Sequence, residues 1–487
     1  MPAFRGCLGF ATAWCIAAAG PDAAFAQPFK VQGPGVNTND FRVTTFAAGL
    51  DYPLGMAQLS DGSLLVTVSP GADFFSSTGR LVRLTDTNQD GIADGAGTVL
   101  YAGLPGTLTA VCTGGNLIFV TGAAKPIIVL RAGAAPANPL TFVGRIIFNY
   151  PSGSWEHQNT ALRLRKTPGQ TNSYDLVFQI GSDSNFAVTT RTVALTNDSI
   201  AGAVGTLAGD SAWMLTVIDH GASVTATNLT QLATGLRNPA GYAFHPVTGD
   251  LYFQDNGIDG LVNVNEPLSA DELNFIARTN LGGAPEFFGF PASYTEYRTG
   301  AIIGGAGIQP LIAFQPLPDP FTGHESEGVN DITFAPPGFP DGLNTGIFLG
   351  FHGRYNLGGT NNEENPVLYA NPATGAYFHF IEGRQAGIGH LDGLLAGRDS
   401  LFVADIATNG FLGSAGAGVI YQIKSLASPT PPIVAAKLNG SQITLTWDRG
   451  VLQEASGVSG PWQDVADGFS PFAVQPDAPG KFYRTRY

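Results

Sequence analysis

Short runs of β-branched and aromatic residues recur along the chain, bounded by Gly, Asp, Asn and Pro, whereas the periodicity of amphipathic helices is scarce. One phrase repeats: a small-residue loop, an apolar pair, Asp-Gly or Thr-Gly, and then an apolar strand. Its clearest copies begin at Gly55, Gly241, Val329 and Leu391, and weaker copies lie at 110–120 and 161–180. This pattern predicts an all-β fold made of repeated sheet units.

A four-stranded unit cannot bury both of its faces alone, but copies stacked around an axis can. Six copies within residues 41–425 give roughly 64 residues each, a length that fits one blade with its loops. We therefore predict a six-bladed β-propeller over residues 41–425, preceded by an extension over 27–40.

The chain beyond the propeller changes character. Residues 426–432 are rich in Pro, Ser and Thr and predict a linker. Residues 433–487 contain three short alternating segments at 443–447, 461–465 and 481–484, which predict a small β-sandwich of immunoglobulin or fibronectin type. Trp447 and Trp462 fall inside these segments, which favours a role in core packing over a sugar-binding platform.

Residues 1–26 have the features of a signal peptide. Arg5 precedes an apolar run over 7–19, and Ala24-Phe25-Ala26 matches a small-x-small cleavage site. The run is too short to span a bilayer, and no later segment resembles a membrane helix. We therefore expect an exported protein, periplasmic or extracellular, without a membrane span. Cleavage would leave Cys112 as the single cysteine, in a segment that predicts a buried strand.

Composition narrows the class of ligand. Hydrophobic residues make up 44% of the chain, enough for a packed core, which excludes a disordered chain. The formal net charge of −14 argues against nucleic acid as a partner, because nucleic-acid-binding proteins present a basic surface.

The sharpest local motif is Asp86-Thr-Asn-Gln-Asp-Gly-Ile-Ala-Asp94. Asp86, Asn88, Asp90 and Asp94 occupy positions 1, 3, 5 and 9, and Gly91 permits a tight turn. Hard oxygen ligands in this spacing suit Ca²⁺, although the closing Glu of an EF-hand is missing. We predict a structural calcium loop; the alternative is an acidic turn without an ion.

Three further residues carry chemistry by their type and position. His157 precedes a predicted strand beside a loop, where an imidazole can act as a base. Asp183 follows at the next loop and could orient that imidazole. Arg237 lies in Gly235-Leu-Arg-Asn-Pro-Ala-Gly241, where Pro and Gly fix a guanidinium as a clamp for an anion or a carbonyl. For each, a structural role is the alternative.

These motifs, in this order, resemble the soluble glucose and sorbosone dehydrogenases that depend on pyrroloquinoline quinone (PQQ). The resemblance implies that His157 is the catalytic base, that Asp183 is its partner, and that Arg237 and Asn238 contact the quinone. Asp255-Asn-Gly257 and Asp271-Glu-Leu-Asn274 are similar to the family's calcium stretch, which implies calcium ligands at Asp255, Asp271 and Glu272. Basic residues against the quinone carboxylates are implied at Arg354 and Arg384.

The chain also departs from the family pattern. Asn159 and Thr160 replace two glycines after the histidine, and the family's cofactor lysine would have to be replaced by His352 or Arg354. Residues 183–213 form a Thr/Ala/Gly-rich insertion beside the expected site.

The resemblance implies oxidation of a sugar or polyol, with PQQ and Ca²⁺ as cofactors and an external electron acceptor. Two other classes remain open. One is a calcium-dependent propeller hydrolase or lactonase, with Asn159, Asn238, Asn256 and Glu325 as candidate ligands. The other is a non-catalytic propeller that binds carbohydrate, in which the C-terminal module contacts a polysaccharide or a cell surface.

Overall fold

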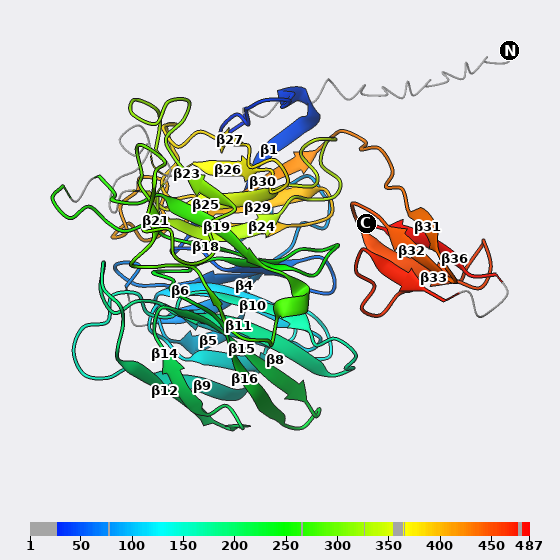
Figure 1. Ribbon diagram of the computed structural model, residues 1–487, viewed down its shortest axis with the longest axis horizontal. Coiled ribbons are helices and arrows are strands. Elements are labelled where there is room, and N and C mark those ends of the chain that lie inside the picture. The colour runs from blue at the N-terminus through cyan, green and yellow to red at the C-terminus, as the bar shows by residue number, and fades with distance from the viewer. Residues whose placement is uncertain are drawn as a thin grey trace, which may run out of the picture.

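The structure is a computed structural model that describes residues 27–75, 78–263, 266–325, 327–353, 364, 366–475 and 480–487. The expected signal peptide over 1–26 and the expected cofactor residue Arg354 lie outside these residues. Within the described residues, six sheets of four or more strands surround a common axis, and two three-stranded sheets follow at the C-terminal end (Figure 1). The prediction of an all-β chain with a six-bladed propeller is confirmed.

Two of the first three blades, blades 2 and 3, carry additions to the basic four-stranded unit. Blade 1 consists of β2 (Met56–Gln58), β3 (Leu64–Val68), β4 (Gly79–Leu84) and β5 (Thr98–Leu104). Blade 2 consists of β6 (Leu108–Gly114), β7 (Leu117–Gly122), β8 (Ile127–Arg131) and β9 (Thr141–Asn149), extended by β12 (Thr192–Asp198) and β14 (Gly205–Ala208). Blade 3 consists of β10 (Leu162–Lys166), β11 (Ser173–Ile180), β15 (Ser211–Asp219) and β16 (Val224–Thr234), with β13 (Ile200–Ala201) and β20 (Glu286–Phe287) paired beside β16.

The other three blades have four strands each. Blade 4 consists of β17 (Tyr242–Phe244), β18 (Leu251–Asp255), β19 (Asp271–Ile276) and β23 (Ile312–Phe314). Blade 5 consists of β24 (Val329–Phe334), β25 (Ile347–Phe351), β26 (Val367–Ala370) and β27 (Tyr377–Ile381). Blade 6 consists of β28 (Gly393–Ala396), β29 (Ser400–Asp405), β30 (Gly418–Ser425) and β1 (Phe41–Leu50). The short elements η1 (Thr38–Asp40), η2 (Arg278–Asn280), β21 (Tyr294–Thr295) and β22 (Ile302–Ile303) lie in the connections.

The ring is closed by the N-terminal strand β1, which completes the last blade. β1 is the outer strand of blade 6 and pairs antiparallel with β30, with Phe41 opposite Ser425. The innermost strands contact one another in the cyclic order β2, β6, β10, β17, β24 and β28. A closed ring of blades leaves only short outer edges exposed, which limits pairing with other chains.

Packing between blades explains the apolar strands seen in the sequence. All five residues of β3 are buried, because this strand lies between two neighbouring blades. Aromatic residues fill the wedge-shaped space where blades diverge; Phe178, Phe314 and Phe348 are fully buried. Cys112 is also buried, and burial raises the pKa of its thiol to about 12, so it is a packing residue and not a nucleophile.

The C-terminal sheets form a separate small core. One sheet contains β31 (Ala435–Asn439), β32 (Gln442–Thr446) and β35 (Phe472–Val474), and the other contains β34 (Gln463–Asp464), β33 (Val451–Ala455) and β36 (Phe482–Arg486). Trp447 is buried in this core, whereas Trp462 is half-buried beneath the Arg484 guanidinium.

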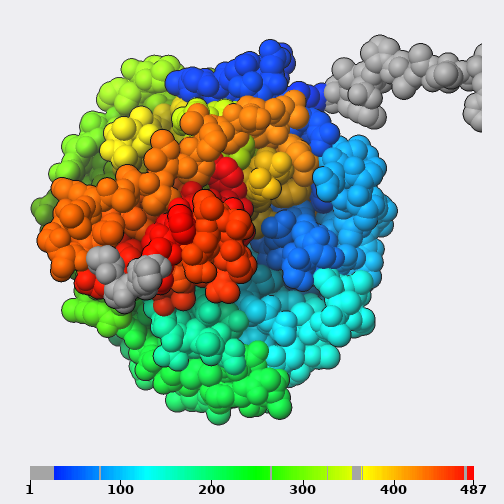
Figure 2. All heavy atoms as spheres, turned by 90° about the vertical axis from the view of Figure 1, so that its right-hand side faces the viewer, coloured from blue at the N-terminus to red at the C-terminus, as the bar shows by residue number. Residues whose placement is uncertain are grey.

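This module packs against the propeller face shown in Figure 2. Val247 of the propeller joins the apolar cluster of Leu445, Trp447 and Leu452. Arg449 lies 3.4 Å from Asp341, and the Arg278 guanidinium lies over the Phe469 ring. No helix among the described residues is long and apolar enough to cross a membrane.

Candidate functional site

A cavity of about 300 Å³ lies where the innermost strands of five blades begin. Its wall includes Met56, Val111, Leu162, Tyr242 and Asp331, each in or beside the first strand of its blade. This volume lies at the lower end of the range for small-molecule sites. The radial repeat therefore brings short segments from distant parts of the sequence to one place.

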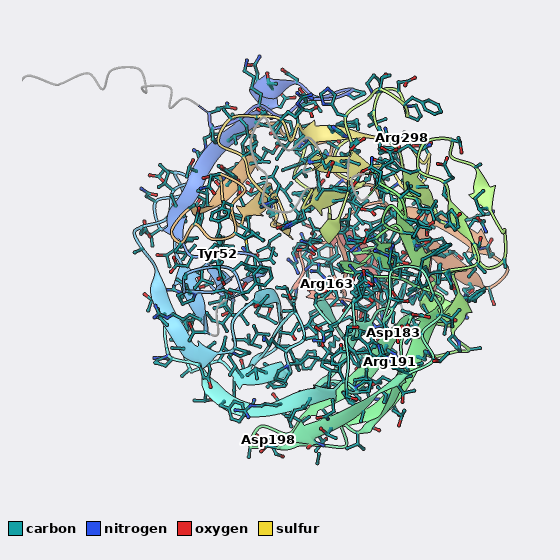
Figure 3. All side chains as sticks on the ribbon, turned by 90° about the vertical axis from the view of Figure 1, so that its left-hand side faces the viewer. Tyr52, Arg163, Asp183, Arg191, Asp198 and Arg298 are labelled. Atoms are coloured by element: carbon teal, nitrogen blue, oxygen red, sulfur yellow. The ribbon has the colours of Figure 1, made fainter. Side chains whose placement is uncertain are left out.

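Arg163 is the cation in the described wall of this cavity, and sequence analysis missed it. The residue lies on β10 near the middle of the ring (Figure 3), and its side chain makes no hydrogen bond or ion pair with any described residue. Its charge acts on the half-buried Asp331, whose pKa is nevertheless raised to about 6 because the carboxyl group is desolvated. A signal was present in the sequence: Arg163 stands in an inner-strand position where the other copies of the repeat carry apolar or small residues.

His157 lies on the loop that leads to this wall, three residues before Thr160, which lines the cavity. Its Nδ1 lies 2.8 Å from Oγ of Ser182, and that hydroxyl donates its own proton to the carbonyl oxygen of Ser184 at 2.7 Å. The Ser182 oxygen must therefore accept a hydrogen bond from Nδ1–H of His157. This assigns the lone pair of the imidazole to Nε2.

Burial and the nearby Arg237 charge lower the pKa of His157 to about 3. The imidazole is thus neutral at physiological pH, the form that can accept a proton.

The expectation that Asp183 orients His157 is wrong. Oδ2 of Asp183 lies 2.6 Å from Nε of Arg191, and the Asp183 amide donates to Oγ1 of Thr189 (Figure 3). Arg191 and Thr189 both come from the insertion over 183–213, which supplies the aspartate with partners of its own. Ser182 takes the orienting role.

Arg237 is brought next to His157 but faces away from the cavity. The Ser182 amide donates to the Arg237 carbonyl at 2.7 Å, while the His157 amide donates to the Ser182 carbonyl at 3.0 Å. Gly181 permits this close approach, because a Cβ there would lie 2.7 Å from Cβ of His157.

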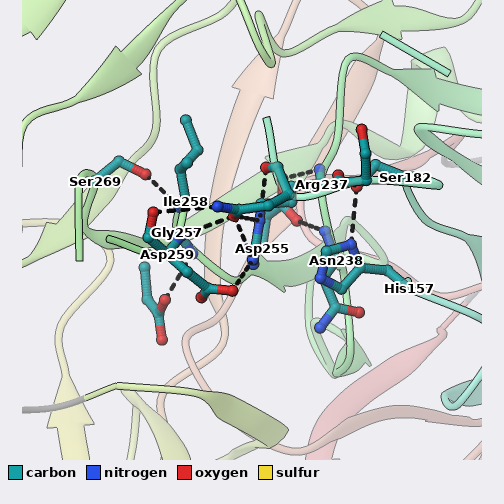
Figure 4. A network of polar contacts seen from close by, with 12 residues as sticks. His157, Ser182, Arg237, Asn238, Asp255, Gly257, Ile258, Asp259 and Ser269 are labelled. Atoms are coloured by element: carbon teal, nitrogen blue, oxygen red, sulfur yellow. Dashed lines mark hydrogen bonds and ion pairs between the residues drawn. The ribbon is translucent and has the colours of Figure 1, made fainter. Parts of the chain in front are cut away.

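The Arg237 guanidinium is already engaged by protein groups (Figure 4). The side chain is only 3% exposed, and its Nη2 donates to Oδ2 of Asp259 at 2.6 Å and to Oδ1 of Asn185 at 2.8 Å. Asn185 belongs to the insertion. The guanidinium for which the resemblance implied contact with the quinone is therefore bound by protein groups, whereas Arg163 lines the cavity.

The expected calcium ligands Asp255 and Asp271 are buried and bind backbone amides. Asp255 accepts from the amides of Arg237 at 2.9 Å and Asn238 at 2.6 Å. Asp271 accepts from the amides of Gly257 at 2.7 Å and Val329 at 3.1 Å. Both carboxylates therefore tie loops of neighbouring blades together, and calcium ligation by them stays a prediction.

Burial, followed by the charges of Asp255 and Asp271, raises the pKa of Glu272 to about 8. Burial also raises the pKa of Asp255 to about 7 and that of Asp271 to about 6. Near neutral pH these three carboxyl groups are therefore not all ionised, as is usual for closely spaced buried carboxyls.

His352, the sequence candidate in place of the family's lysine, lines the cavity. Its Nδ1 lies 2.9 Å from Oδ2 of the fully buried Asp392, and its ring stacks on that of His390 at 4.1 Å. The carboxylate and the stacked ring fix the orientation of this second imidazole. Asn238 is half-buried at the rim, whereas Arg384 is exposed.

The Asp86–Asp94 loop is held by its own backbone amides. Asp86 accepts from the amide of Gly91 at 2.9 Å, Asp90 from that of Ile92 at 2.9 Å, and Asp94 from that of Thr87 at 2.9 Å. Asn88 donates to Asp90 at 2.9 Å. These hydrogen bonds within the loop are enough to explain its conformation, and calcium binding remains a prediction.

Asn159, one of the candidate ligands of the hydrolase alternative, is engaged by neighbouring protein groups. The amide nitrogen of Asn159 donates to the carbonyl of Lys125 at 2.8 Å, and its oxygen accepts from Tyr150 at 3.0 Å. Asn159 is therefore a structural residue of the loop, and its 1% exposure agrees with that.

Comparisons with known proteins give the fold a precedent. The chain is similar to the holo PQQ domain of pyranose dehydrogenase from Coprinopsis cinerea, with a TM-score of 0.52 and 16% identity over 82% of this chain and 98% of that one. It is also similar to a calcium structure of carbohydrate-active enzyme family AA12 from Trichoderma reesei, with a TM-score of 0.51 and 16% identity over 83% of this chain and 99% of that one. At this identity the similarity shows the fold.

Sequence comparisons add little. No family model matches the chain. A stretch of 60 residues, 12% of the chain, is 42% identical to an uncharacterized protein of Borreliella burgdorferi, and it spans 14% of that protein. The propeller is thus structurally similar to PQQ-dependent sugar dehydrogenases at low sequence identity.

Proposed function

We propose that this chain is an exported oxidoreductase that oxidises a sugar or polyol with PQQ as its cofactor. One observation carries the proposal: a neutral imidazole, with its tautomer fixed by Ser182, lies on the loop that enters the cavity wall at Thr160. The same wall contains Arg163, a cation whose side chain has no partner among the described residues. An oriented base and an unpaired guanidinium at a small-molecule cavity are the two groups that such a reaction needs from the protein. The similarity to the pyranose dehydrogenase domain supports the proposal at the level of fold.

The described residues fit the quinone at one of its carboxylates. PQQ is a planar tricarboxylate, so its site needs a cation that faces an open cavity, with N–H donors around it. Arg163 supplies the cation, and Asn256 and Asn330 supply amide side chains in the same wall. Arg163, Asn256 and Asn330 are therefore the residues that would hold the cofactor.

The residues of the chain have separate tasks in this reaction. Nε2 of His157 takes the proton of the substrate hydroxyl, while Ser182 holds the opposite nitrogen as Nδ1–H. The chemistry that PQQ supplies when bound is acceptance of a hydride from the substrate carbon that carries this hydroxyl group. The substrate is thereby oxidised to a carbonyl compound. An external acceptor then removes the two electrons. Because its pKa is about 3, His157 is a weak base, and we expect it to contribute near the lower end of the usual range.

A second candidate is a propeller that binds a sugar without oxidising it. The engagement of Arg237 by Asp259 and Asn185 favours this alternative, because Arg163 is then the one guanidinium among the described cavity residues that could bind a tricarboxylate. A neutral polyol needs only N–H, O–H and carbonyl groups, which the cavity wall supplies.

Titration of the full chain with PQQ, with and without calcium, separates the two. The proposal expects saturable binding seen in the quinone absorbance, and reduction of a dye acceptor with aldoses, sorbosone or polyols. No quinone binding, together with sugar binding by calorimetry, would reject the oxidoreductase in favour of the second candidate.

A further inference from the structure

Three glutamates outside the central site point their carboxylates at one another. Single oxygens of Glu325, Glu327 and Glu364 all lie within 4.8 Å of one another. Glu325 and Glu327 precede β24, and Glu364 precedes β26 in the same blade. The Glu327 amide donates to the Glu364 carbonyl at 3.2 Å, so the backbone also holds the two segments together. We call these three residues the glutamate cluster.

Several oxygens at the cluster are buried without a partner in the part of the chain that the structure describes. Glu325 is 8% exposed and Tyr297 is 1% exposed. Oε2 of Glu325, Oε1 of Glu327 and the hydroxyl of Tyr297 are buried and make no hydrogen bond there. The charges of Glu327 and Glu325 both act on Tyr297, which places its hydroxyl beside the cluster. Buried polar atoms are nearly always satisfied, so three unsatisfied oxygens at one point call for a missing partner.

The cluster also concentrates negative charge. Arg298 donates to Glu325 and, on its other side, to Glu266. This guanidinium is therefore shared between the cluster and a residue outside it. Closely spaced buried carboxylates are costly unless cationic groups lie beside them.

We propose that the glutamate cluster, with the Tyr297 hydroxyl, binds a divalent cation that prefers oxygen ligands, and that this cation is Ca²⁺. Three carboxylates and a hydroxyl form an all-oxygen donor set, which suits calcium; Mg²⁺ needs a stricter octahedron and retains its water. A dication stabilises carboxylates that lie this close together. The ligand set differs from the Asp86–Asp94 loop and from Asp255, Asp271 and Glu272, although the charge of Asp271 acts on Glu327.

The position of the cluster gives the ion a structural task at the cavity. The Gly353 amide donates to the Glu327 carbonyl at 3.0 Å, and the His352 amide donates to the Gly328 carbonyl at 2.9 Å. Gly328, His352 and Gly353 all line the cavity. An ion that fixes Glu327 thereby fixes the blade 5 side of the cavity wall.

Calcium chloride titrated into the chelator-treated full chain, without PQQ, tests the site. We expect wild type to bind calcium in a calorimeter and to melt at a higher temperature with it. Glu327→Gln and Glu364→Gln keep the side-chain shape and should weaken this binding by at least about tenfold, because each removes a charged ligand. Asp90→Asn, in the other acidic loop, is the matched control and should keep this binding component.

Terbium provides a second readout that does not depend on a glutamate variant folding. Tb³⁺ occupies calcium sites, and its emission is sensitised by a tyrosine beside it. When the tyrosines of the wild-type protein are excited, bound Tb³⁺ should emit, and added calcium should reduce this emission by displacing the ion. Tyr297→Phe should lose most of the emission.

Absence of calcium binding by wild type would overturn the proposal. Undiminished binding by Glu327→Gln and Glu364→Gln, or full terbium emission from Tyr297→Phe, would do the same. Because PQQ is absent throughout, these outcomes are independent of the proposed oxidoreductase activity.

Discussion

The hydroxyl of Ser182 accepts a hydrogen bond from Nδ1–H of His157 at 2.8 Å and donates a hydrogen bond to the Ser184 carbonyl at 2.7 Å. This relay fixes one imidazole tautomer without a carboxylate. A carboxylate at this position would raise the pKa of the imidazole, whereas a hydroxyl leaves it low. Burial and the Arg237 charge therefore keep His157 neutral, while the Ser182 hydroxyl fixes its tautomer.

Ser182→Ala should lower kcat by about tenfold and leave the KM and the PQQ affinity nearly unchanged, because only the orientation of the base is lost. Ser182→Thr keeps the hydroxyl and should restore most of the rate. Steady-state kinetics with the reconstituted enzyme measures both. An unchanged kcat in Ser182→Ala would show that the tautomer needs no hydroxyl.

His157→Gln should reduce turnover by about 10²–10⁴-fold, towards the lower figure because His157 is a weak base. Glutamine can still form hydrogen bonds but accepts no proton near neutral pH, so PQQ binding should persist. Parallel quinone titration and dye reduction check the two quantities. Full activity in His157→Gln would falsify the assigned base.

Arg163→Met should weaken PQQ binding by about tenfold or more, because it removes the unpaired guanidinium from the cavity while keeping most of the side-chain volume. The fold should be nearly unaffected, since Arg163 forms no hydrogen bond or ion pair with a described residue. Absorbance titration and thermal melting measure the two effects.

Arg237→Met is the matched contrast, because this buried guanidinium binds Asp259 and Asn185. We expect it to lower the free energy of unfolding by about 1.5–3 kcal/mol, from the loss of charged hydrogen bonds. If Arg237→Met weakened PQQ binding more than Arg163→Met did, the assignment of cofactor binding to Arg163 and of a structural role to Arg237 would be wrong.

Acid should destabilise the protein through His157. Its pKa is about 3 in the folded protein and about 6.5 when unfolded, so between these values the unfolded state binds the additional proton. The contribution of His157 is therefore present above pH 6.5 and lost as the pH falls towards 3, by up to about 1.4 kcal/mol per pH unit. Denaturant unfolding of wild type and His157→Gln between pH 7 and 4 should show a difference that narrows in acid.

Asp90→Ala should lower the melting temperature by about 1–3 °C even in chelator, because its carboxylate accepts from the Ile92 amide and from Asn88. If the loop also binds calcium, as its spacing predicts, the deficit should be larger with added calcium. Asp90→Asn keeps one acceptor and is the control. A wild-type and Asp90→Ala pair with equal melting temperatures in both conditions would leave the loop without a stabilising role.

Local pattern was enough to predict the architecture. The repeated loop-and-strand phrase specifies strands with buried faces, and such units are stable only when stacked, so six copies imply a six-bladed ring. Sequence position also singled out His157, an imidazole between a loop and an inner strand, as a candidate base, and that role stays a prediction. Neither inference needs to know which side chains from distant blades meet.

The partners of each site residue were decided by the tertiary structure. Asp183 and Ser182 are neighbours in sequence, and only the folded insertion, which places Arg191 and Thr189 beside Asp183, leaves Ser182 to His157. The same insertion places Asn185 on Arg237 and so leaves Arg163 as the cation of the cavity.

The glutamate cluster shows the same division. In the sequence, Glu325, Glu327 and Glu364 are three acids spread over forty residues in a chain with 38. Their meeting depends on the pairing of blade 5 strands, and the Arg298 guanidinium that reaches Glu325 is shared with Glu266. Sequence determines what each segment is, because secondary structure follows local pattern; the fold determines what each charge faces, because electrostatic partners are set by distance in space.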